Sequence, residues 1–242
     1  LAMLLAETLW PARPWAEPRL KRLGFHALVA GVNTFLYRLL LAAPLMALAG
    51  AVHGRGWGLS GVLGLTGAAE ILAAVLALDM ANYWWHRWNH RVPLLWRFHR
   101  AHHYDTHVDA GTSLRFHFGE LVLSGGLKSL WILAWGPSPE AFLLFEAAIT
   151  LFAQFHHANI DLPEPLERLA RLAVMTPRLH AAHHTVSLRS RDANYATILL
   201  WWDRLFGSFE EADPEELKAL GLKEGRDRDL DFAAFWAAPA RL

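Results

Sequence analysis

The sequence contains no cysteine in its 242 residues. The absence of thiols excludes a disulfide framework, a thiolate metal site and a cysteine nucleophile, so any bound metal must use nitrogen and oxygen ligands. Charged residues are scarce, at 19%, and the 23 basic residues balance the 23 acidic ones. A formal net charge of zero provides no general attraction to a polyanion, and we expect no nucleic-acid partner.

Apolar residues are abundant instead. Hydrophobic types make up 54% of the sequence, with 12 tryptophans and 13 phenylalanines, which is a high share for a soluble domain and indicates a membrane protein. The mostly apolar stretches are residues 26–52, 62–85, 119–135 and 139–156. Because about 20 apolar residues cross the hydrocarbon core, we predict an all-α integral membrane protein with about four transmembrane helices. Only Gly-Pro-Ser at 136–138 separates the last two stretches, which predicts a tight helical hairpin.

Charges within these stretches leave an alternative open, a soluble helical protein whose apolar helices form its core. Glu70, Lys128 and Glu146 all interrupt apolar segments. Intramembrane charges are costly and are functional candidates by default. An ion pair between Lys128 and one of the two glutamates is an equally good interpretation.

The arginines predict how the chain is oriented. With four crossings, residues 1–25, the segment 86–118 and the tail after residue 156 all fall on one side, and all are arginine-rich. The loops on the other side contain a single basic residue, Arg55. The positive-inside rule therefore places the arginine-rich side on the cytoplasmic face. We expect residues 1–25 to be an interfacial lead-in rather than a folded unit.

Three histidine motifs dominate the arginine-rich side. His86 and His90 form H-x-x-x-H, and H-x-x-H-H occurs at 99–103 and again at 180–184. Positions i, i+3 and i+4 of a helix share a face, so each motif points its imidazoles in one direction. Single histidines are usually solvated or hydrogen-bonded side chains, but a repeated spacing of this kind indicates metal ligands. Together the motifs present eight nitrogen donors, too many for one tetrahedral metal and suited to a pair.

The chemistry of such a pair depends on the metal. Neutral imidazole suits iron, zinc and copper. Zinc would supply an activated water, whereas iron would supply oxygen activation. A site at the membrane face suits an apolar substrate with a polar head, and the unactivated C–H bonds of a lipid need a strong oxidant such as iron with dioxygen.

The chain resembles the fatty acid hydroxylase superfamily, also called the sterol desaturase family. The order of the three histidine motifs in a four-span frame is typical of that family, and the similarity covers roughly residues 70–210. The segments that carry it are DMANYWWHR at 79–87, THVDAGTSLRFHFGE at 106–120, FHHANIDLP at 155–163, TPRLHAAHH at 176–184 and DANYATILLWWDRLFGSF at 192–209. Two positions depart from the family pattern, Phe118 in place of a proline and Ala196 in place of a glycine. Neither is a proposed ligand, so they bear on local geometry rather than on the chemistry.

The resemblance implies an integral-membrane di-iron oxygenase that acts on a lipid, with dioxygen as cosubstrate. It implies one domain over residues 1–242, in which a helical, histidine-rich cap on the cytoplasmic side holds the dinuclear site. The implied metal ligands are His86, His90, His99, His102, His103, His157, His180, His183 and His184. His157, the ninth implied ligand, matches a family histidine outside the three motifs. Zinc is a substitute that such a site could hold in place of iron.

Metal-bound imidazoles commonly donate their second ring N–H to a carboxylate or a carbonyl. The candidates for positions around the ligands are Asp79, Asp105, His107, His117, His156, Asp192 and Asn194. Ordinary helix capping is an equally good interpretation of the aspartates and the asparagine. His26 and His53 lie outside the resemblance, and we interpret them as interfacial histidines.

Two other functions compete with lipid hydroxylation or desaturation. A membrane zinc hydrolase would use the same ligands to activate water, but it needs a glutamate base and none of the histidine motifs contains one. A non-enzymatic metal carrier would place histidines and carboxylates at mid-membrane depth, whereas these cluster beyond the span ends. An oxygenase would take electrons from a separate reductase or from a ferredoxin- or cytochrome-type donor, because no flavin, haem or nucleotide motif is visible. The sequence leaves the substrate open among sterols, fatty acyl chains and related lipids.

Overall fold

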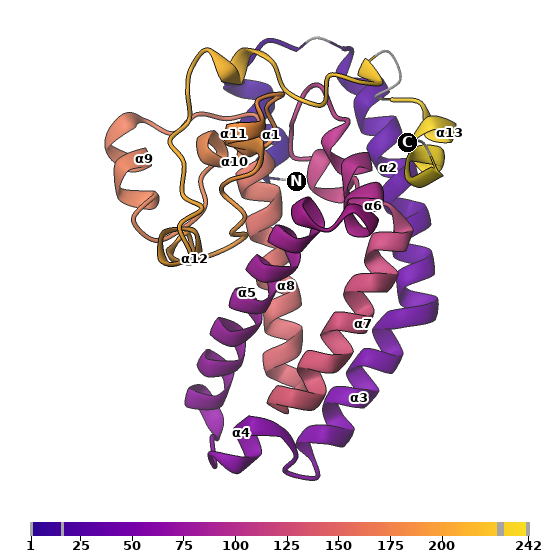
Figure 1. Ribbon diagram of the computed structural model, residues 1–242, viewed down its shortest axis with the longest axis vertical. Helices are drawn as coiled ribbons and strands as arrows, with labels where there is room; N and C mark the ends of the chain where they lie inside the picture. The colour runs from indigo at the N-terminus through magenta and orange to yellow at the C-terminus, as the bar shows by residue number, and fades with distance from the viewer. Residues whose placement is uncertain (1, 16, 227–229, 241–242) are drawn as a thin grey trace.

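Four long helical segments run side by side along the long axis of the molecule in the computed structural model, which describes residues 2–15, 17–226 and 230–240 (Figure 1). They are α2 (Arg19–Tyr37) with its continuation through the π-helix η1 (Arg38–Ala42) into α3 (Ala43–His53), then α5 (Gly67–Arg91), α7 (Phe118–Trp135) and α8 (Pro139–His157). The short helix α4 (Gly58–Val62) connects α3 to α5 at the lower end. No β-strand occurs in the part of the chain that the structure describes, so the predicted all-α class is confirmed.

Short helices form a cap at the upper end of the long ones (Figure 1). They are α1 (Ala2–Leu9), α6 (Pro93–His103), η2 (Thr112–Leu114), α9 (Glu164–Ala170), α10 (Pro177–His183), α11 (Leu188–Arg191), α12 (Trp201–Leu205), η3 (Glu216–Lys218), α13 (Phe232–Ala237) and η5 (Ala238–Ala240). Pro93 and Pro177 occupy the first helical position of α6 and α10, where the missing N–H leaves no hydrogen bond unmade. Proline therefore fixes where the two histidine-bearing cap helices begin.

The connection between α7 and α8 is as short as predicted. Gly136 ends α7 with a φ of 76°, and a Cβ at this position would lie 2.0 Å from the carbonyl oxygen of Trp57, so only glycine fits. Ser138 caps α8 by accepting a hydrogen bond from the Ala141 backbone N–H at 3.1 Å. The Glu70 carboxylate on α5 accepts hydrogen bonds from the Ser138 N–H and hydroxyl, at 3.0 and 2.7 Å. Glu70 is thus a structural tie between α5 and the hairpin.

An apolar core holds the long helices together. Leu45 on α3, Leu78 on α5, Ile132 on α7 and Phe145 on α8 are all buried in it. Burial of each such side chain contributes on the order of 1.5–3 kcal/mol. A second buried cluster, which includes Tyr83 and Tyr195, joins α5 to the cap. The two clusters give the cap and the long helices a shared interior.

One helical stretch, residues 19–62, is long and apolar enough by itself to cross a bilayer, with a mean hydropathy of 1.8, among the residues described. The other long helices contain the charges noted in the sequence. Lys128 on α7 and Glu146 on α8 form an ion pair with 2.6 Å between Nζ and Oε1, which confirms the ion-pair interpretation for that glutamate. The structure therefore confirms the helices over all four apolar stretches, and their placement in a membrane stays a prediction.

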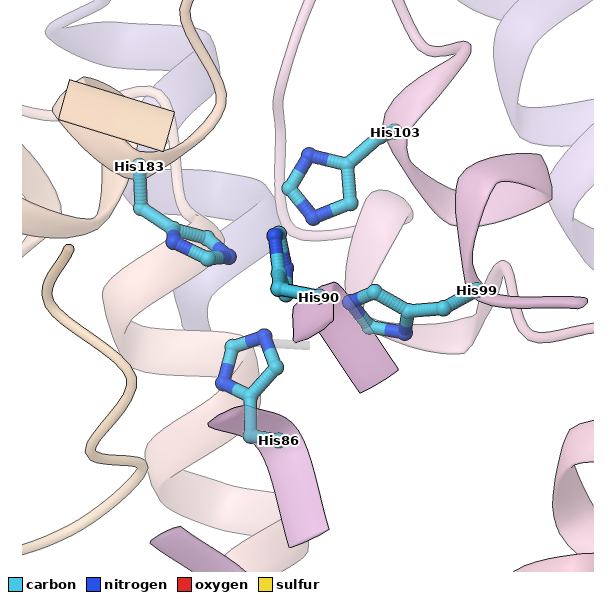
Figure 2. Close-up of side chains that lie close together, drawn as sticks. All are labelled: His86, His90, His99, His103 and His183. Carbon is cyan, nitrogen blue, oxygen red and sulfur yellow. The ribbon is translucent and has the colours of Figure 1, made fainter. Parts of the chain in front are cut away.

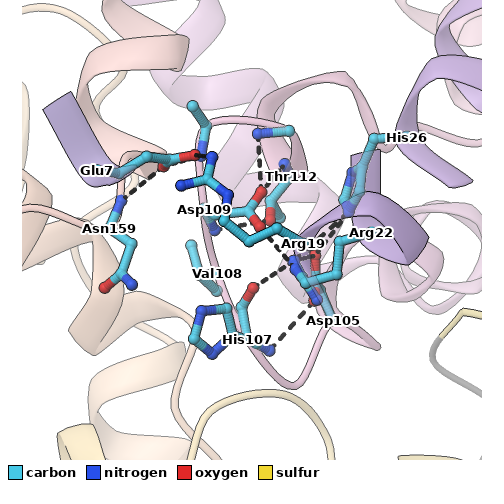
Figure 3. A network of polar contacts seen from close by, with 12 residues as sticks. Glu7, Arg19, Arg22, His26, Asp105, His107, Val108, Asp109, Thr112 and Asn159 are labelled. Carbon is cyan, nitrogen blue, oxygen red and sulfur yellow. Dashed lines mark hydrogen bonds and ion pairs between the residues drawn. The ribbon is translucent and has the colours of Figure 1, made fainter. Parts of the chain in front are cut away.

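The N-terminal residues are part of the fold, and the prediction of an interfacial lead-in is wrong for them. Glu7 on α1 is fully buried, and its Oε2 oxygen accepts hydrogen bonds from the backbone N–H groups of Ala110 and Asn159 at 2.9 and 3.1 Å (Figure 3). Its Oε1 oxygen pairs with Arg19 at 3.0 Å. Local composition does not predict contacts between residues more than a hundred positions apart, so it could not indicate these hydrogen bonds.

A buried ion-pair network continues from this region into the loop that follows α6 (Figure 3). Arg22 is 1% exposed and contacts Asp105 through Nη1 at 2.9 Å and Asp109 through Nε at 2.6 Å. His26 is buried 3.6 Å from Asp105, so the prediction that it is interfacial is also wrong. Burial alone would raise the pKa of the Asp105 carboxyl, but the Arg22 and Arg115 guanidiniums hold that pKa well below its usual range.

Candidate metal centre

All nine histidines predicted as ligands converge where the cap meets the long helices. His86 and His90 come from α5, His99, His102 and His103 from α6, His157 from the end of α8, His180 and His183 from α10, and His184 from the residue that ends α10. The chain thus brings together residues nearly a hundred positions apart. Each helical motif presents its imidazoles toward the others, as its spacing predicts.

The nine side chains divide into two groups. The five-histidine group consists of His86, His90, His99, His103 and His183, shown in Figure 2. The four-histidine group consists of His102, His157, His180 and His184. In each group the candidate ligand nitrogens lie within 4.8 Å of one another. This division gives two separate, adjacent places where a metal ion could bind.

Hydrogen bonds to carbonyl oxygens fix the tautomer of several rings. The Nδ1 atoms concerned are those of His86 to Tyr195 O, His183 to Ala193 O and His157 to Ala153 O, each at 2.7 Å, and of His102 to Arg115 O at 3.2 Å. A carbonyl oxygen only accepts, so each Nδ1 bears the hydrogen and each Nε2 keeps a free lone pair. The Nε2 atoms of His86, His99 and His183 are buried without a hydrogen-bond partner among the described residues. Such orphaned lone pairs are what a metal ion would satisfy.

The spacing of these nitrogens suits coordination. In the four-histidine group, Nε2 of His157 lies 3.1 Å from Nε2 of His102 and 3.0 Å from Nε2 of His180. Ligands about 2.1 Å from one metal are separated by roughly 3.0 Å at a right angle and 3.4 Å at a tetrahedral angle. The observed separations fall within that range. An all-imidazole donor set of this kind fits first-row divalent metals such as iron and zinc.

Burial lowers the pKa of several of these imidazoles and so keeps them neutral. Desolvation, with repulsion from neighbouring histidines, lowers the pKa of His86 to about 3. Desolvation likewise lowers the pKa of His157 to about 4, and the pKa values of His103 and His184 fall well below the ordinary value for the same two reasons. Only neutral imidazole binds a metal, so the environment holds these side chains in their ligand form.

Glu120, the first acidic residue of α7, is a neighbour that the sequence analysis missed. Its Oε1 oxygen lies 2.9 Å from Nδ1 of His99 and 3.4 Å from the Asn89 amide nitrogen. Two of the predicted neighbours do lie beside the histidine groups. Asp192 is 3.5 Å from Nδ1 of His90, and the His156 ring lies 4.0 Å from that of His180. Glu120 is the last residue of the family-like segment 106–120 and lies at the start of an apolar helix. That position is the sequence signal that could have identified it as a neighbour of the histidines.

The family comparison bears on this geometry. The model of the family described as fatty acid hydroxylase matches residues 71–208, which is more than half of the chain. The chain belongs to the fatty acid hydroxylase family. The matched segment contains both histidine groups and Glu120. The family resemblance seen in the sequence is thereby confirmed.

Several curated proteins are similar to this fatty acid hydroxylase family member. An alkylglycerol monooxygenase of Homo sapiens is 34% identical over 140 residues, 57% of this chain and 30% of the relative. An ornithine lipid hydroxylase of Rhizobium tropici is 30% identical over 143 residues, 59% and 42% of the two chains. A cholesterol 25-hydroxylase of Mus musculus is 26% identical over 155 residues, 63% and 51%. The matches cover only about a third to a half of these relatives. No solved structure matches the chain.

A cavity of about 460 Å³ adjoins both histidine groups of this family member. Its wall includes His86, His99, His102, His157 and His180. From the histidines it extends between the long helices, past Trp85 and Phe116, as far as Lys128 and Glu146. The cavity therefore connects the candidate metal centre with the middle of the helical body.

The other predicted neighbours have different contacts. Asp79 accepts hydrogen bonds from the Leu199 N–H and the Trp202 indole, which ties α5 to the cap. Asn194, in the left-handed region at φ 55°, donates to Leu179 O and Glu210 O. Both side chains connect separate segments of the fold, and these contacts are not helix caps.

Three more predicted neighbours also contact groups other than the ligand imidazoles. Asp105 belongs to the Arg22 network. His107 packs on the Trp15 ring, with 4.7 Å between the centroids. His117 caps α7 by accepting from the Gly119 N–H at 3.0 Å. These contacts position the segments around the site.

Replacing Glu120 by alanine is expected to lower metal affinity about 10- to 100-fold, because the carboxylate orients His99 and loss of such a partner typically costs this much. Glu120→Gln keeps an accepting oxygen and should lose less. Glu215→Ala is the matched control, since that side chain is 78% exposed. Metal retained against a series of chelator concentrations measures the effect. Equal retention by Glu120→Ala and the wild type would show that His99 does not depend on this carboxylate.

Proposed function

We propose that this chain is a membrane-bound oxidoreductase that uses dioxygen and two iron ions to hydroxylate a lipid. The observation that carries the proposal is the division of nine histidines into two groups beside one cavity. Iron bound by the nine histidines would activate dioxygen, which zinc does not do. Zinc could still occupy the same nitrogens, because imidazole accepts both metals.

The chain's own residues would orient the reactants. The backbone carbonyls of Tyr195, Ala193 and Ala153 hold the ligand tautomers, and Glu120 orients His99. The cavity would hold the lipid with one carbon beside the histidines and exclude bulk water around it. Hydroxylation rather than desaturation is favoured by the relatives, whose names are those of a monooxygenase and two hydroxylases.

The reaction needs an electron donor. Hydroxylation places one oxygen atom of dioxygen in a C–H bond and reduces the other to water, which takes an electron pair and two protons from outside the substrate. We infer a separate reductase or a ferredoxin- or cytochrome-type protein as the donor.

The proposed membrane arrangement has four crossings and a cytoplasmic cap. The outward faces of the long helices support it, because they expose large apolar side chains where a soluble helix exposes polar ones. Examples are Phe35 on α2, Leu72 on α5, Leu130 on α7 and Leu151 on α8, each more than 60% exposed. The arginine-rich cap supports the cytoplasmic orientation through the positive-inside rule.

The absence of native cysteine makes the arrangement testable with single cysteines. Arg55→Cys lies in the loop before α4, and Glu215→Cys immediately precedes η3 in the cap. A membrane-impermeant maleimide should label Glu215→Cys only in inside-out vesicles and Arg55→Cys only in right-side-out vesicles. The cysteine-free parent measures background. Labelling of both positions from the same side would contradict four crossings.

The functional test begins with anaerobic purification in detergent, metal analysis and Mössbauer spectroscopy of iron-labelled protein. About two coupled irons per chain, with lipid-dependent oxygen uptake when a reduced ferredoxin is supplied, would support the oxygenase. The oxidised lipid is then identified by mass spectrometry with labelled dioxygen. Iron that does not bind after reconstitution would overturn the di-iron proposal.

A zinc hydrolase is the second candidate, and Glu120 is the observation that favours it. Its Oε2 oxygen is buried without a hydrogen-bond partner among the described residues, and Glu120 belongs to the cavity wall. A carboxylate in that place could act as a base toward a bound water. Zinc-dependent ester hydrolysis without oxygen uptake would support this candidate, and lipid oxidation would exclude it.

A further inference from the structure

The cavity beside the histidines has exposed wall residues on α2, η1 and α8, from which we infer a side opening between these helices. Thr34 and Arg38 on one side of it and Thr150 on the other belong to the cavity wall and are exposed. In contrast, Asn33 and His157, which line the cavity at its histidine end, are buried. A lipid could therefore reach the histidines sideways, from between the helices, without passing through the cap.

The lower end of the cavity has charged side chains, and two of them are already paired. Lys128 and Glu146 form their ion pair at 2.6 Å, and the Tyr37 hydroxyl donates to Glu146 at 3.4 Å. These contacts balance the negative charge of Glu146 and connect α2, α7 and α8. The remaining charge at this level is Arg38.

The Arg38 guanidinium makes no hydrogen bond or ion pair with any residue that the structure describes, while the Arg38 backbone N–H donates to Phe35 O at the end of α2. It is exposed, lines the cavity and begins the π-helix η1, with the exposed apolar side chains Leu39 and Leu40 beside it. Short π-helices within α-helices are frequent at functional sites. The Arg38 guanidinium lies in the stretch 19–62, which is long and apolar enough to cross a bilayer, and none of the described residues gives it a counter-charge.

We propose that Arg38 binds an anionic oxygen of the lipid substrate, a phosphate or a carboxylate, at this side opening. The inference rests on the proposed function for the identity of the ligand as substrate. Guanidinium binds both anions with paired, charge-assisted hydrogen bonds. A bound anion would also remove the cost of the unpaired charge, so the site prefers anionic to neutral lipids.

The position of Arg38 also predicts which part of the lipid reacts. Asn33 donates to Phe116 O at 2.7 Å, and the Phe116 ring stacks on His102 with 4.6 Å between the centroids. Arg38 follows Asn33 by five residues, about 7.5 Å along the helix. An anionic group at Arg38 would therefore lie about 7.5 Å along the helix axis from the level of Asn33, so we expect oxidation nearer the polar end of the lipid than the far end of a long chain.

The test compares three lipids with the same acyl chain and different heads, namely oleate, oleoyl lysophosphatidate and monooleoylglycerol. Dissociation constants are measured with radiolabelled lipid on the full chain in detergent. We expect the wild type to bind at least one anionic lipid about 10-fold more tightly than the neutral one. Arg38→Gln should weaken that binding about 10- to 100-fold and leave the neutral lipid within about twofold, while Arg38→Lys should fall between.

Arg55→Gln is the matched control, because Arg55 is an exposed arginine away from the cavity wall, with its guanidinium donating to Ala51 O and lying over the Trp57 ring. It should bind all three lipids as the wild type does. Preference for lysophosphatidate identifies a phosphate head, and preference for oleate a carboxylate. Wild-type affinities in Arg38→Gln, or an equal loss for all three lipids, would overturn the proposal.

Iron content measured on the same preparations separates the two proposals. A wild type that does not bind iron after anaerobic reconstitution but prefers anionic lipids would refute the oxygenase and leave the Arg38 site standing. An iron-loaded wild type whose preference survives Arg38→Gln would refute the Arg38 site alone.

Discussion

Replacing His157 by alanine is expected to remove one of the two metal ions and to abolish lipid-dependent oxygen uptake. His157 belongs to the four-histidine group, and its Nε2 lies 3.1 and 3.0 Å from those of His102 and His180. The variant retains only three imidazoles there, while the five-histidine group is untouched. Loss of an orienting partner alone costs 10- to 100-fold, so loss of a ligand should cost more than about 100-fold in activity.

The five-histidine group should tolerate the same change better. His90→Ala leaves four imidazoles in its group, enough for a four-coordinate site. We therefore expect His90→Ala to bind its metal more weakly but to retain it in the absence of chelator. Metal per chain, measured by mass spectrometry after desalting, distinguishes the two variants.

His53→Ala is the control for both variants. His53 lies at the opposite end of the long helices, 3.2 Å from the Gly136 carbonyl oxygen, and should keep both metals. If His157→Ala keeps the full metal complement and its activity, the four-histidine group is not a metal site. If every histidine variant loses both metals together, the two groups are not independent.

The sequence predicted which histidines meet but left their division into two groups unassigned. On a helix, residues i and i+4 lie about 40° apart around the axis, whereas adjacent residues lie about 100° apart. This is the pattern observed, since His99 and His103 share one group while His102 joins the other. His180 and His184 likewise share a group from which His183 is excluded. The helical geometry was present in the spacing and could have given the division.

Contacts between distant segments are what the sequence could not provide. Glu120 meets His99 across 21 positions, and Arg22 meets Asp105 across 83. Nothing in a local pattern distinguishes an arginine that will be buried against a distant loop from one that lies at a membrane surface. The four long helices, by contrast, follow from the length of the apolar segments and from helix-ending residues such as Gly136. Both are local properties of the sequence.

The second large expected effect is a loss of stability on replacing Arg22, the buried arginine of the ion-pair network. Arg22→Met should destabilise the protein by about 3–5 kcal/mol, because it leaves the buried carboxylates of Asp105 and Asp109 without their partner. For a chain of this size, each kcal/mol shifts the midpoint of thermal unfolding by roughly 2–4 °C, so we expect a decrease of about 6–20 °C. Thermal unfolding in detergent, followed by circular dichroism, measures it.

Lys21→Met on the same helix is the matched control. Lys21 pairs with Glu17 at 2.9 Å, but the two side chains are 57% and 37% exposed, so the pair should contribute less than about 1 kcal/mol. Arg22→Lys retains the charge without the planar fork and should unfold between the wild type and Arg22→Met. If Arg22→Met does not accumulate in cells, the unfolding midpoint of Arg22→Lys can still be compared with those of the wild type and Lys21→Met.

The effect of Arg22 should extend to the candidate metal centre. Asp105 follows His103 by two residues, and its carboxylate is held by Arg22 through two hydrogen bonds at 2.9 and 3.0 Å. Loosening this loop frees the end of α6, which presents three of the nine histidines. Arg22→Lys should therefore lose metal to a chelator more readily than Lys21→Met at a temperature where both are folded. Equal metal retention and equal unfolding midpoints would mean that the Arg22 network does not support the histidine groups.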